Sequence, residues 1–187
     1  MLSLPNSVTL LRIFLIPCLI LVYYLPIPYA NWITGGIFTL ACLTDWLDGY
    51  LARKLNQTSK FGAFLDPVAD KLIVAVALVL IVGDFGSIWV TIPAAIIVSR
   101  EIAISALREW MAEIGKRANV AVNFIGKAKT FIQMISIIIL LIHPTHWSKF
   151  WVVIGLFLMY LAVALTLWSM LTYLKAAFLE MRFDKST

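Results

Sequence analysis

The chain has 187 residues, of which 62% are hydrophobic and only 13% carry a charge. Its mean hydropathy is +0.95, and the apolar share of soluble domains is only about 45 to 50%. This composition excludes an ordinary soluble domain and indicates an integral membrane protein. The net charge of +5 predicts anionic headgroups or substrates as partners and no nucleic acid, because the sequence contains no nucleic-acid-binding motif.

Six apolar runs, separated by clusters of Gly, Pro and Asn, approach or exceed the roughly 20 residues that a helix needs to cross a membrane. They lie at about 7–26, 31–53, 60–83, 88–111, 121–142 and 149–176. We therefore predict an all-α membrane protein with six transmembrane helices. The runs and their short connectors use nearly all residues, which predicts a single integral membrane domain over residues 1–187.

Lys and Arg residues are concentrated in the connectors that we place on one side of the membrane. They lie near 53–60 and 113–129, whereas the connectors near 27–30, 84–87 and 143–148 have none. By the positive-inside rule, this predicts that both termini and the 53–60 connector are cytoplasmic. His143 and His146 then fall in an outer loop, where we expect no functional role for them.

The first apolar run carries polar residues on one stripe. Asn6, Thr9 and Arg12 recur every three residues, so they share a helix face. This face either looks into a polar interior or belongs to an ordinary interfacial helix whose Arg12 snorkels to the headgroups. The sequence leaves both alternatives open.

Four aspartates interrupt the second and third runs. Asp45 and Asp48 are spaced i, i+3, and Asp66 and Asp70 are spaced i, i+4, so each pair occupies one helix face. An unpaired charge at the centre of a membrane helix costs about 2.5 to 3.5 kcal/mol, so we expect the two pairs to converge around cations. Carboxylates without His or Cys favour Mg²⁺ or Mn²⁺ over zinc. Two such ions can hold a phosphate during phosphoryl transfer.

Small residues and one arginine accompany these aspartates. Gly49 and Ala52 lie on the Asp45/Asp48 side of the helix, and Gly62 precedes Asp66 by four residues, which leaves space for a ligand. Arg53 can pair with phosphate oxygens through its planar fork. Together they predict a diphosphate pocket. A single aspartate pair could merely flank a membrane helix at headgroup level, but four aspartates in register with these residues do not fit that alternative.

The spacing Asp45-x2-Asp48-Gly49-x2-Ala52-Arg53-x8-Gly62-x3-Asp66-x3-Asp70 resembles the signature of the CDP-alcohol phosphotransferase family and matches it at every position. From TLLRI at 9–13 to SREIAISALREWMAEIGKRANVAVNFIGKAKT at 99–130, the chain is similar to bacterial members that use glycerol 3-phosphate as acceptor. The resemblance thus covers most of the chain.

This resemblance implies a six-helix catalytic domain, usually a homodimer, in the bacterial cytoplasmic (inner) membrane, with the active site at the cytoplasmic end of the bundle. It implies a metal-dependent transferase that moves the phosphatidyl group of CDP-diacylglycerol to sn-glycerol 3-phosphate, giving phosphatidylglycerophosphate and CMP for phosphatidylglycerol and cardiolipin biosynthesis. It assigns the metal ligands to Asp45, Asp48, Asp66 and Asp70, with Asp70 also the general base, and the cytidine diphosphate cradle to Gly49, Ala52, Arg53 and Gly62.

An anionic acceptor needs cations, and the second half of the chain supplies them. We expect Arg100, Arg108 and Lys127 to bind the acceptor phosphate, with weaker contributions from Arg117 and Lys129. Internal ion pairs with Glu101, Glu109 or Glu113 are the alternative for some of these charges. Serine or phosphatidylglycerol as acceptor remains an alternative within the family. A divalent-cation transporter is the alternative of another class, although an ion path needs ligands near mid-membrane or on both sides.

Overall fold

The computed structural model is built of helices and connections, with no strand in the residues it describes. These residues are 4–55, 60–113, 124–143 and 149–184, with side chains described for 8–45, 62, 64–107, 109–111, 128–143 and 149–171. The helices are α1 (Leu4–Tyr24), α2 (Ala30–Leu55), α3 (Lys60–Phe85), α4 (Ile88–Glu113), α5 (Phe124–Ile142) and α6 (Lys149–Asp184). Each coincides with one of the six predicted apolar runs, although α6 continues to Asp184. The all-helical, six-helix prediction is confirmed.

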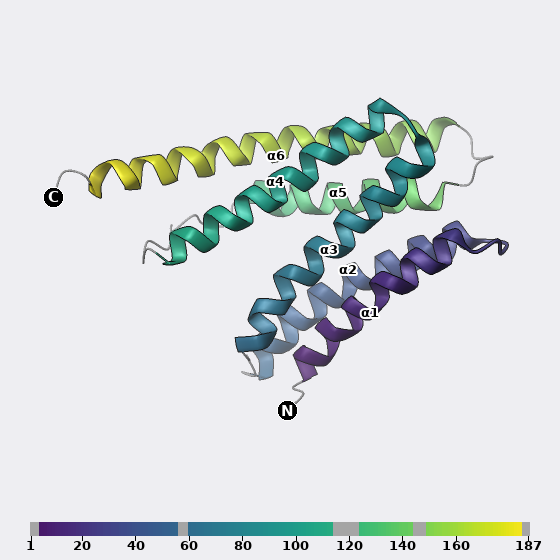
Figure 1. Cartoon of the computed structure of the whole chain (residues 1–187), viewed down its shortest axis with the longest axis horizontal. Helices are drawn as coiled ribbons and strands as arrows, with labels where there is room; N and C mark the ends of the chain where they lie inside the picture. The colour runs from purple at the N-terminus through teal and green to yellow at the C-terminus, as the bar shows by residue number, and fades with distance from the viewer. Residues whose placement is uncertain (1–3, 56–59, 114–123, 144–148, 185–187) are drawn as a thin grey trace.

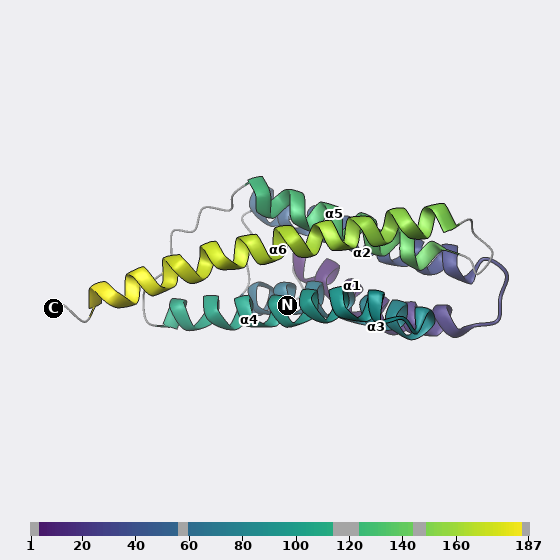
Figure 2. The ribbon, with the colours of Figure 1, turned by 90° about the horizontal axis from the view of Figure 1, so that it is seen from above.

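Helices that follow one another in the chain run in opposite directions. In Figure 1, α1 and α2 lie in the lower part of the molecule and α4, α5 and α6 in the upper part, and α3 runs from the lower part to the upper one. Helix α1 packs on α2 and α3, α5 packs on α6 and α2, and α4 packs on α6 and α3. Figure 2 shows α2 and α5 on one side when the molecule is seen from above and α1, α3 and α4 on the other, and α6 slants from beside α5 toward the level of α4. The start of α1, the end of α2 and the start of α3 therefore lie at the same end of the molecule.

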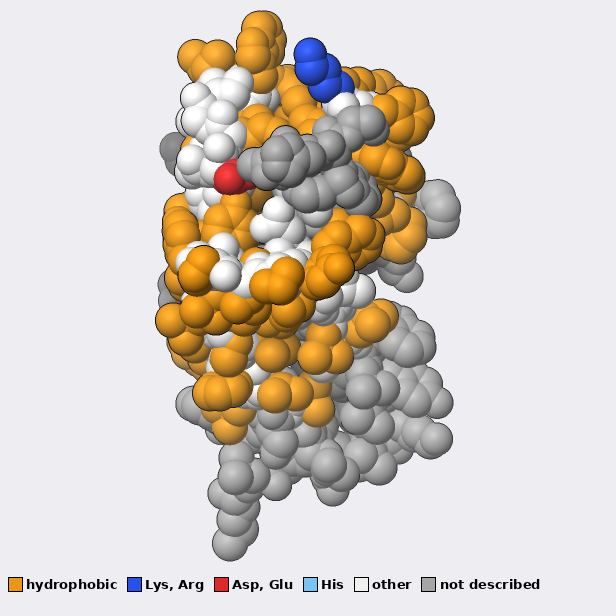
Figure 3. All heavy atoms as spheres, turned by 90° about the vertical axis from the view of Figure 1, so that its right-hand side faces the viewer, with side chains coloured by type: hydrophobic (Ala, Val, Ile, Leu, Met, Phe, Trp, Pro, Cys, Tyr) orange, Lys and Arg blue, Asp and Glu red, His pale blue; other side chains and the backbone are white. Residues whose placement is uncertain are grey.

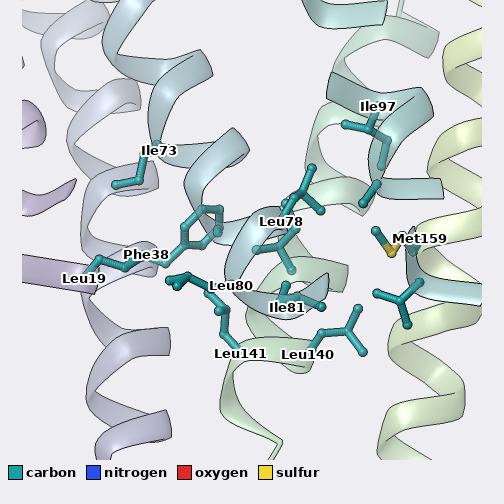
Figure 4. Close-up of a cluster of buried hydrophobic side chains, with 14 of the residues drawn as sticks. Leu19, Phe38, Ile73, Leu78, Leu80, Ile81, Ile97, Leu140, Leu141 and Met159 are labelled. Atoms are coloured by element: carbon teal, nitrogen blue, oxygen red, sulfur yellow. The ribbon is translucent and has the colours of Figure 1, made fainter. Parts of the chain in front are cut away.

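One hydrophobic core joins all six helices (Figure 4). Each helix contributes at least one side chain that is at most 1% exposed: Leu19 from α1, Phe38 from α2, Leu78 from α3, Ile97 from α4, Leu140 from α5 and Met159 from α6. Burial of large apolar side chains stabilises a fold by roughly 1.5 to 3 kcal/mol each. This core fixes the helix ends on which the candidate site is built.

The outside of the bundle is also apolar. Phe14, Leu21, Val79, Phe131 and Phe157 are each at least 65% exposed, and hydrophobic side chains cover much of the described surface in Figure 3. Within the described residues, the stretches 88–111 and 149–171 are long and apolar enough to cross a membrane, and 8–24 and 128–142 are shorter apolar helices. An apolar surface of this extent is typical of a protein that contacts lipid.

Two helix contacts depend on glycine. A Cβ atom at Gly155 of α6 would lie 2.8 Å from Leu140 Cδ2 of α5, and a Cβ atom at Gly35 of α2 would overlap the Ile142 side chain at the end of α5. The buried Ser136 hydroxyl on α5 donates a hydrogen bond of 2.7 Å to the Gly155 carbonyl. Helix α5 is therefore held closely between α2 and α6. No paired small-residue motif in the sequence predicted these contacts.

We expect Gly155→Ala to lower the free energy of unfolding by about 1 to 3 kcal/mol, the usual cost of overpacking. Leu140 is 1% exposed, so it has no room to move away from the added methyl group. The matched control is Gly36→Ala, where a Cβ atom meets nothing within 4 Å and the helix gains up to about 1 kcal/mol of propensity. Thermal unfolding of the purified variants measures the difference. Equal melting temperatures would contradict the close approach of α5 and α6.

Candidate active site

Three of the four signature aspartates lie together where α2 ends and α3 begins. Asp45 comes from α2, and Asp66 and Asp70 come from one face of α3, one turn apart. One ligand oxygen from each lies within 4.8 Å of the other two. The antiparallel course of α2 and α3 brings the two faces together, as the helical spacing predicted. Asp48 follows Asp45 by three residues on the same helix, but its side chain lies outside the described residues.

Arg12 of α1 reaches the same cluster. Its Nη1 atom lies 3.4 Å from Asp45 Oδ1 and 3.1 Å from Asp66 Oδ1, and it also pairs with Asp70 Oδ1. The Arg12 side chain is fully buried, whereas the three aspartate side chains are 35 to 39% exposed. Arg12 therefore meets the carboxylates from inside the bundle, and their other side stays open. Of the two alternatives for the polar stripe of α1, the structure supports the one that faces a polar interior.

A cavity of about 260 Å³ adjoins the cluster between α2, α3, α4 and α5. Asp45 and Asp70 line it together with Lys71, Glu101 and Gln133. The Lys71 ammonium donates a hydrogen bond to the Ser105 hydroxyl of α4. Apolar side chains make up much of the remaining wall. The cavity thus places two of the signature aspartates opposite polar groups from the second half of the chain.

Two of the predicted acceptor cations meet at Glu101. Arg100 Nη1 lies 3.0 Å and Lys129 Nζ 2.7 Å from Glu101 Oε1. The Arg100 side chain also donates a hydrogen bond of 2.7 Å to Ser169 on α6. Both cations are at most 9% exposed, and Glu101 connects them to the cavity wall. The internal ion pair that the sequence offered as an alternative is therefore present for Arg100.

The other predicted site residues are placed less completely. Helix α2 continues through Gly49, Ala52 and Arg53, whose side-chain surroundings lie outside the described residues. Gly62 is half-buried near the start of α3. The side chains of Arg108 and Lys127, and the whole of Arg117, also lie outside the described residues. Their assignments stay predictions.

Sequence reasoning did not assign Glu101 or Gln133 to the site. The available signal was a polar stripe along α5, where Lys129, Gln133 and Ser136 follow at i, i+4 and i+7 in an apolar run. All three are at most 5% exposed. Polar residues with this spacing share one helix face, and that face lies toward the interior.

The end of the bundle where α3 and α5 end has a different character. The His143 Nε2 atom lies 3.7 Å from Asp84 Oδ2, and its ring packs on Phe85. His146 lies outside the described residues. Among the described side chains, only the three clustered aspartates form a group of at least three potential metal ligands. The potential metal ligands among the described side chains therefore gather at the opposite end, where α1 begins.

The donor set of the cluster fits a hard divalent cation. Mg²⁺ and Mn²⁺ prefer carboxylate oxygens, and zinc sites normally include His or Cys. Three carboxylates that converge on one Arg12 nitrogen also form a site that attracts positive charge. Their partial exposure leaves an approach for an ion and its anionic ligand.

Comparison with known proteins is consistent with this arrangement. The family model for CDP-alcohol phosphatidyltransferase matches residues 2–168. Proteins named CDP-diacylglycerol--glycerol-3-phosphate 3-phosphatidyltransferase from Escherichia coli (strain K12), Salmonella choleraesuis and Shigella flexneri are each 53% identical to the chain over 175 residues, which cover 94% of both sequences. The chain belongs to the CDP-alcohol phosphatidyltransferase family. Its bacterial relatives carry the name of one particular reaction, the transfer to glycerol 3-phosphate.

Proposed function

We propose that the protein transfers the phosphatidyl group of CDP-diacylglycerol to sn-glycerol 3-phosphate, giving phosphatidylglycerophosphate and CMP. The observation that carries this proposal is the convergence of Asp45, Asp66 and Asp70 beside a cavity lined by polar groups from α4 and α5. The names of relatives at 53% identity over 94% of the chain support the choice of substrates. The product belongs to phosphatidylglycerol and cardiolipin biosynthesis.

The aspartates hold the metal in this proposal. Asp45, Asp48, Asp66 and Asp70 would bind Mg²⁺ or Mn²⁺, and four carboxylates supply enough oxygen ligands for two ions. When bound, the metal neutralises the diphosphate and makes CMP a better leaving group. Gly49, Ala52 and Gly62 leave space for the cytidine diphosphate, and Arg53 pairs with its phosphate oxygens.

Asp70 is the general base of the proposed reaction. It belongs to the aspartate cluster and also lines the cavity, which supports a role between a donor bound at the cluster and an acceptor bound in the cavity. The acceptor hydroxyl attacks the phosphorus that carries the lipid, and its proton passes to the Asp70 carboxylate. The bond between that phosphorus and the oxygen of CMP breaks, and CMP leaves with the bonding electron pair. An aspartate is a weak base for an alcohol, so its placement beside the reacting hydroxyl has to supply much of the effect.

The acceptor phosphate binds at the cations around Glu101. Arg100 and Lys129 are buried and held by one carboxylate at the cavity wall, which fixes their charged ends before the substrate arrives. Preorganised donors of this kind lose little entropy on binding. Arg108, Lys127 and Arg117 complete the site in this proposal. In this proposal the phosphate of glycerol 3-phosphate lies across the cavity from Asp70.

We place the protein in the bacterial cytoplasmic membrane as a six-span homodimer, with the active site and both termini at the cytoplasmic face. The exposed apolar side chains and the two stretches of 24 and 23 residues that are long enough to cross a bilayer support a membrane location. The positions of Lys and Arg in the connectors support the orientation. The donor lipid then enters from the inner leaflet.

An acceptor panel tests the proposed reaction. Purified protein is mixed with CDP-diacylglycerol and Mg²⁺, and CMP release is followed with sn-glycerol 3-phosphate, serine, inositol or phosphatidylglycerol. We expect CMP release with glycerol 3-phosphate alone, because only this acceptor brings a terminal phosphate monoester for the buried cations around Glu101; serine and inositol have no phosphate, and the phosphate of phosphatidylglycerol is a diester. CMP release with serine alone would contradict the assignment of glycerol 3-phosphate as acceptor. It would not contradict the proposed metal site. Divalent-ion transport into vesicles without CMP release would favour the alternative that the protein is a divalent-cation transporter.

A further inference from the structure

Arg12 has no role in the reaction described above, yet it is the most deeply buried charge of the cluster. Its side chain is 0% exposed, and its Nη1 atom contacts one oxygen each of Asp45, Asp66 and Asp70. The arginine belongs to α1, whereas the aspartates belong to α2 and α3. One guanidinium therefore ties three helices together at the site.

The charge balance indicates what this guanidinium does. Three carboxylates within 4.8 Å of one another repel unless a cation lies between them. Arg12 supplies one positive charge at the point where their oxygens converge, which leaves two net negative charges among these four groups. A buried arginine is always charged, so this compensation is present at every physiological pH and needs no bound ion.

We propose that Arg12 is the built-in counter-cation of the aspartate cluster. In metal-free protein it holds Asp45, Asp66 and Asp70 together, and it weakens binding of divalent ions because it occupies the same oxygens. The second half of this proposal rests on the metal site proposed above. In this role Arg12 is a positioning residue, since it acts through the aspartates.

The first test uses thermal unfolding of the purified full-length protein in EDTA. Arg12→Gln removes the charge, so we expect a lower melting temperature. Asp70→Asn in the same chain removes one of the repelling carboxylates, so the double variant Arg12→Gln/Asp70→Asn recovers part of that loss. The melting temperature of Asp70→Asn alone completes a double-mutant cycle. The cycle gives the interaction energy between Arg12 and Asp70. Should Arg12→Gln fail to fold, folding of the double variant gives the same answer.

The second test measures Mn²⁺ binding by the electron paramagnetic resonance signal of the free ion. Removal of a unit charge next to the ligands is expected to lower the Mn²⁺ Kd of Arg12→Gln by roughly tenfold or more. Arg12→Lys keeps the charge and serves as the matched control, with a Kd close to that of the wild type. A purely structural arginine would give weaker binding in both variants.

These measurements separate failure of the inference from failure of the proposed function. Equal or weaker Mn²⁺ binding by folded Arg12→Gln, with tight binding by the wild type, would overturn the competition between Arg12 and the metal. Absence of rescue in the double variant would overturn the counter-cation role, because loss of packing then explains the instability. Absence of Mn²⁺ binding by the wild type would contradict the proposed metal site, and with it the competition, while the EDTA melts still decide the counter-cation role.

Discussion

Asp70→Asn is expected to reduce CMP release from CDP-diacylglycerol and glycerol 3-phosphate by about 10³-fold or more, since general-base catalysis alone contributes about 10² to 10⁴-fold. The amide has nearly the same shape as the carboxylate, but it cannot accept the proton of the attacking hydroxyl. It also removes one of the three potential metal ligands of the cluster. We expect binding of CDP-diacylglycerol to be retained in part, because Asp45 and Asp66 remain as proposed metal ligands. Single-turnover CMP release together with an equilibrium binding assay separates the two effects.

Asp84→Asn is the matched control for this prediction. It makes the same chemical change in the same helix, but Asp84 lies at the far end of α3, near His143. We expect turnover of this variant to stay within about twofold of the wild type, since surface changes away from special features usually have small effects. Near-normal turnover of Asp70→Asn would remove Asp70 from the role of base.

Lys129→Met is expected to raise the KM for glycerol 3-phosphate by roughly tenfold to a hundredfold, with little change in the KM for CDP-diacylglycerol. A hydrogen bond to a charged group contributes about 1.5 to 3 kcal/mol, and each 1.4 kcal/mol changes affinity tenfold. Methionine keeps the length and apolar stem of lysine, so the buried packing is largely retained. Arg100→Met is expected to act in the same direction. Initial rates with each substrate varied in turn measure the effect.

Lys149→Met serves as the control for the acceptor prediction, because Lys149 is exposed at the start of α6. We expect both KM values of this variant to match those of the wild type. If Lys129→Met raises both KM values equally, or lowers kcat with unchanged KM, the lysine does not bind the acceptor phosphate. The pairing of Lys129 with Glu101 would then have a structural role, which is the alternative of an internal ion pair.

The helices could be predicted closely from the sequence because each contains an apolar run, and Gly, Pro or Asn lies near most of their ends. The end of α6, which has none of these residues, continues past the predicted limit to Asp184. The convergence of Asp45, Asp66 and Asp70 could also be predicted, because helical spacing fixes the face of each pair and a short connector brings the two helices together. These predictions depend only on local geometry. They hold without any knowledge of how distant helices pack.

Features that depend on distant helices were not predictable in the same way. The direction of the Arg12 side chain depends on its contacts with Asp45, Asp66 and Asp70, which lie 33 to 58 positions later in the chain. The sequence therefore left two alternatives open for this side chain. The link between Lys129 and Glu101 joins α5 to α4, and the close contact at Gly155 depends on the place of Leu140. Such contacts follow from the register of one helix against another, which periodicity alone does not fix.

The central claim is that aspartates from neighbouring helices hold a divalent ion against the diphosphate of a cytidine-activated lipid. Pulsed electron paramagnetic resonance of the Mn²⁺-loaded protein tests it most directly, because a phosphorus nucleus of a directly bound phosphate gives a resolvable hyperfine coupling to the ion. With CDP-diacylglycerol added, we expect a phosphorus coupling in the wild type and a smaller fraction of Mn²⁺ with that coupling in Asp66→Asn, which removes one of the proposed ligands. Bound Mn²⁺ that shows no phosphorus coupling in the wild type, or the same fraction of Mn²⁺ with that coupling in Asp66→Asn, would contradict the account.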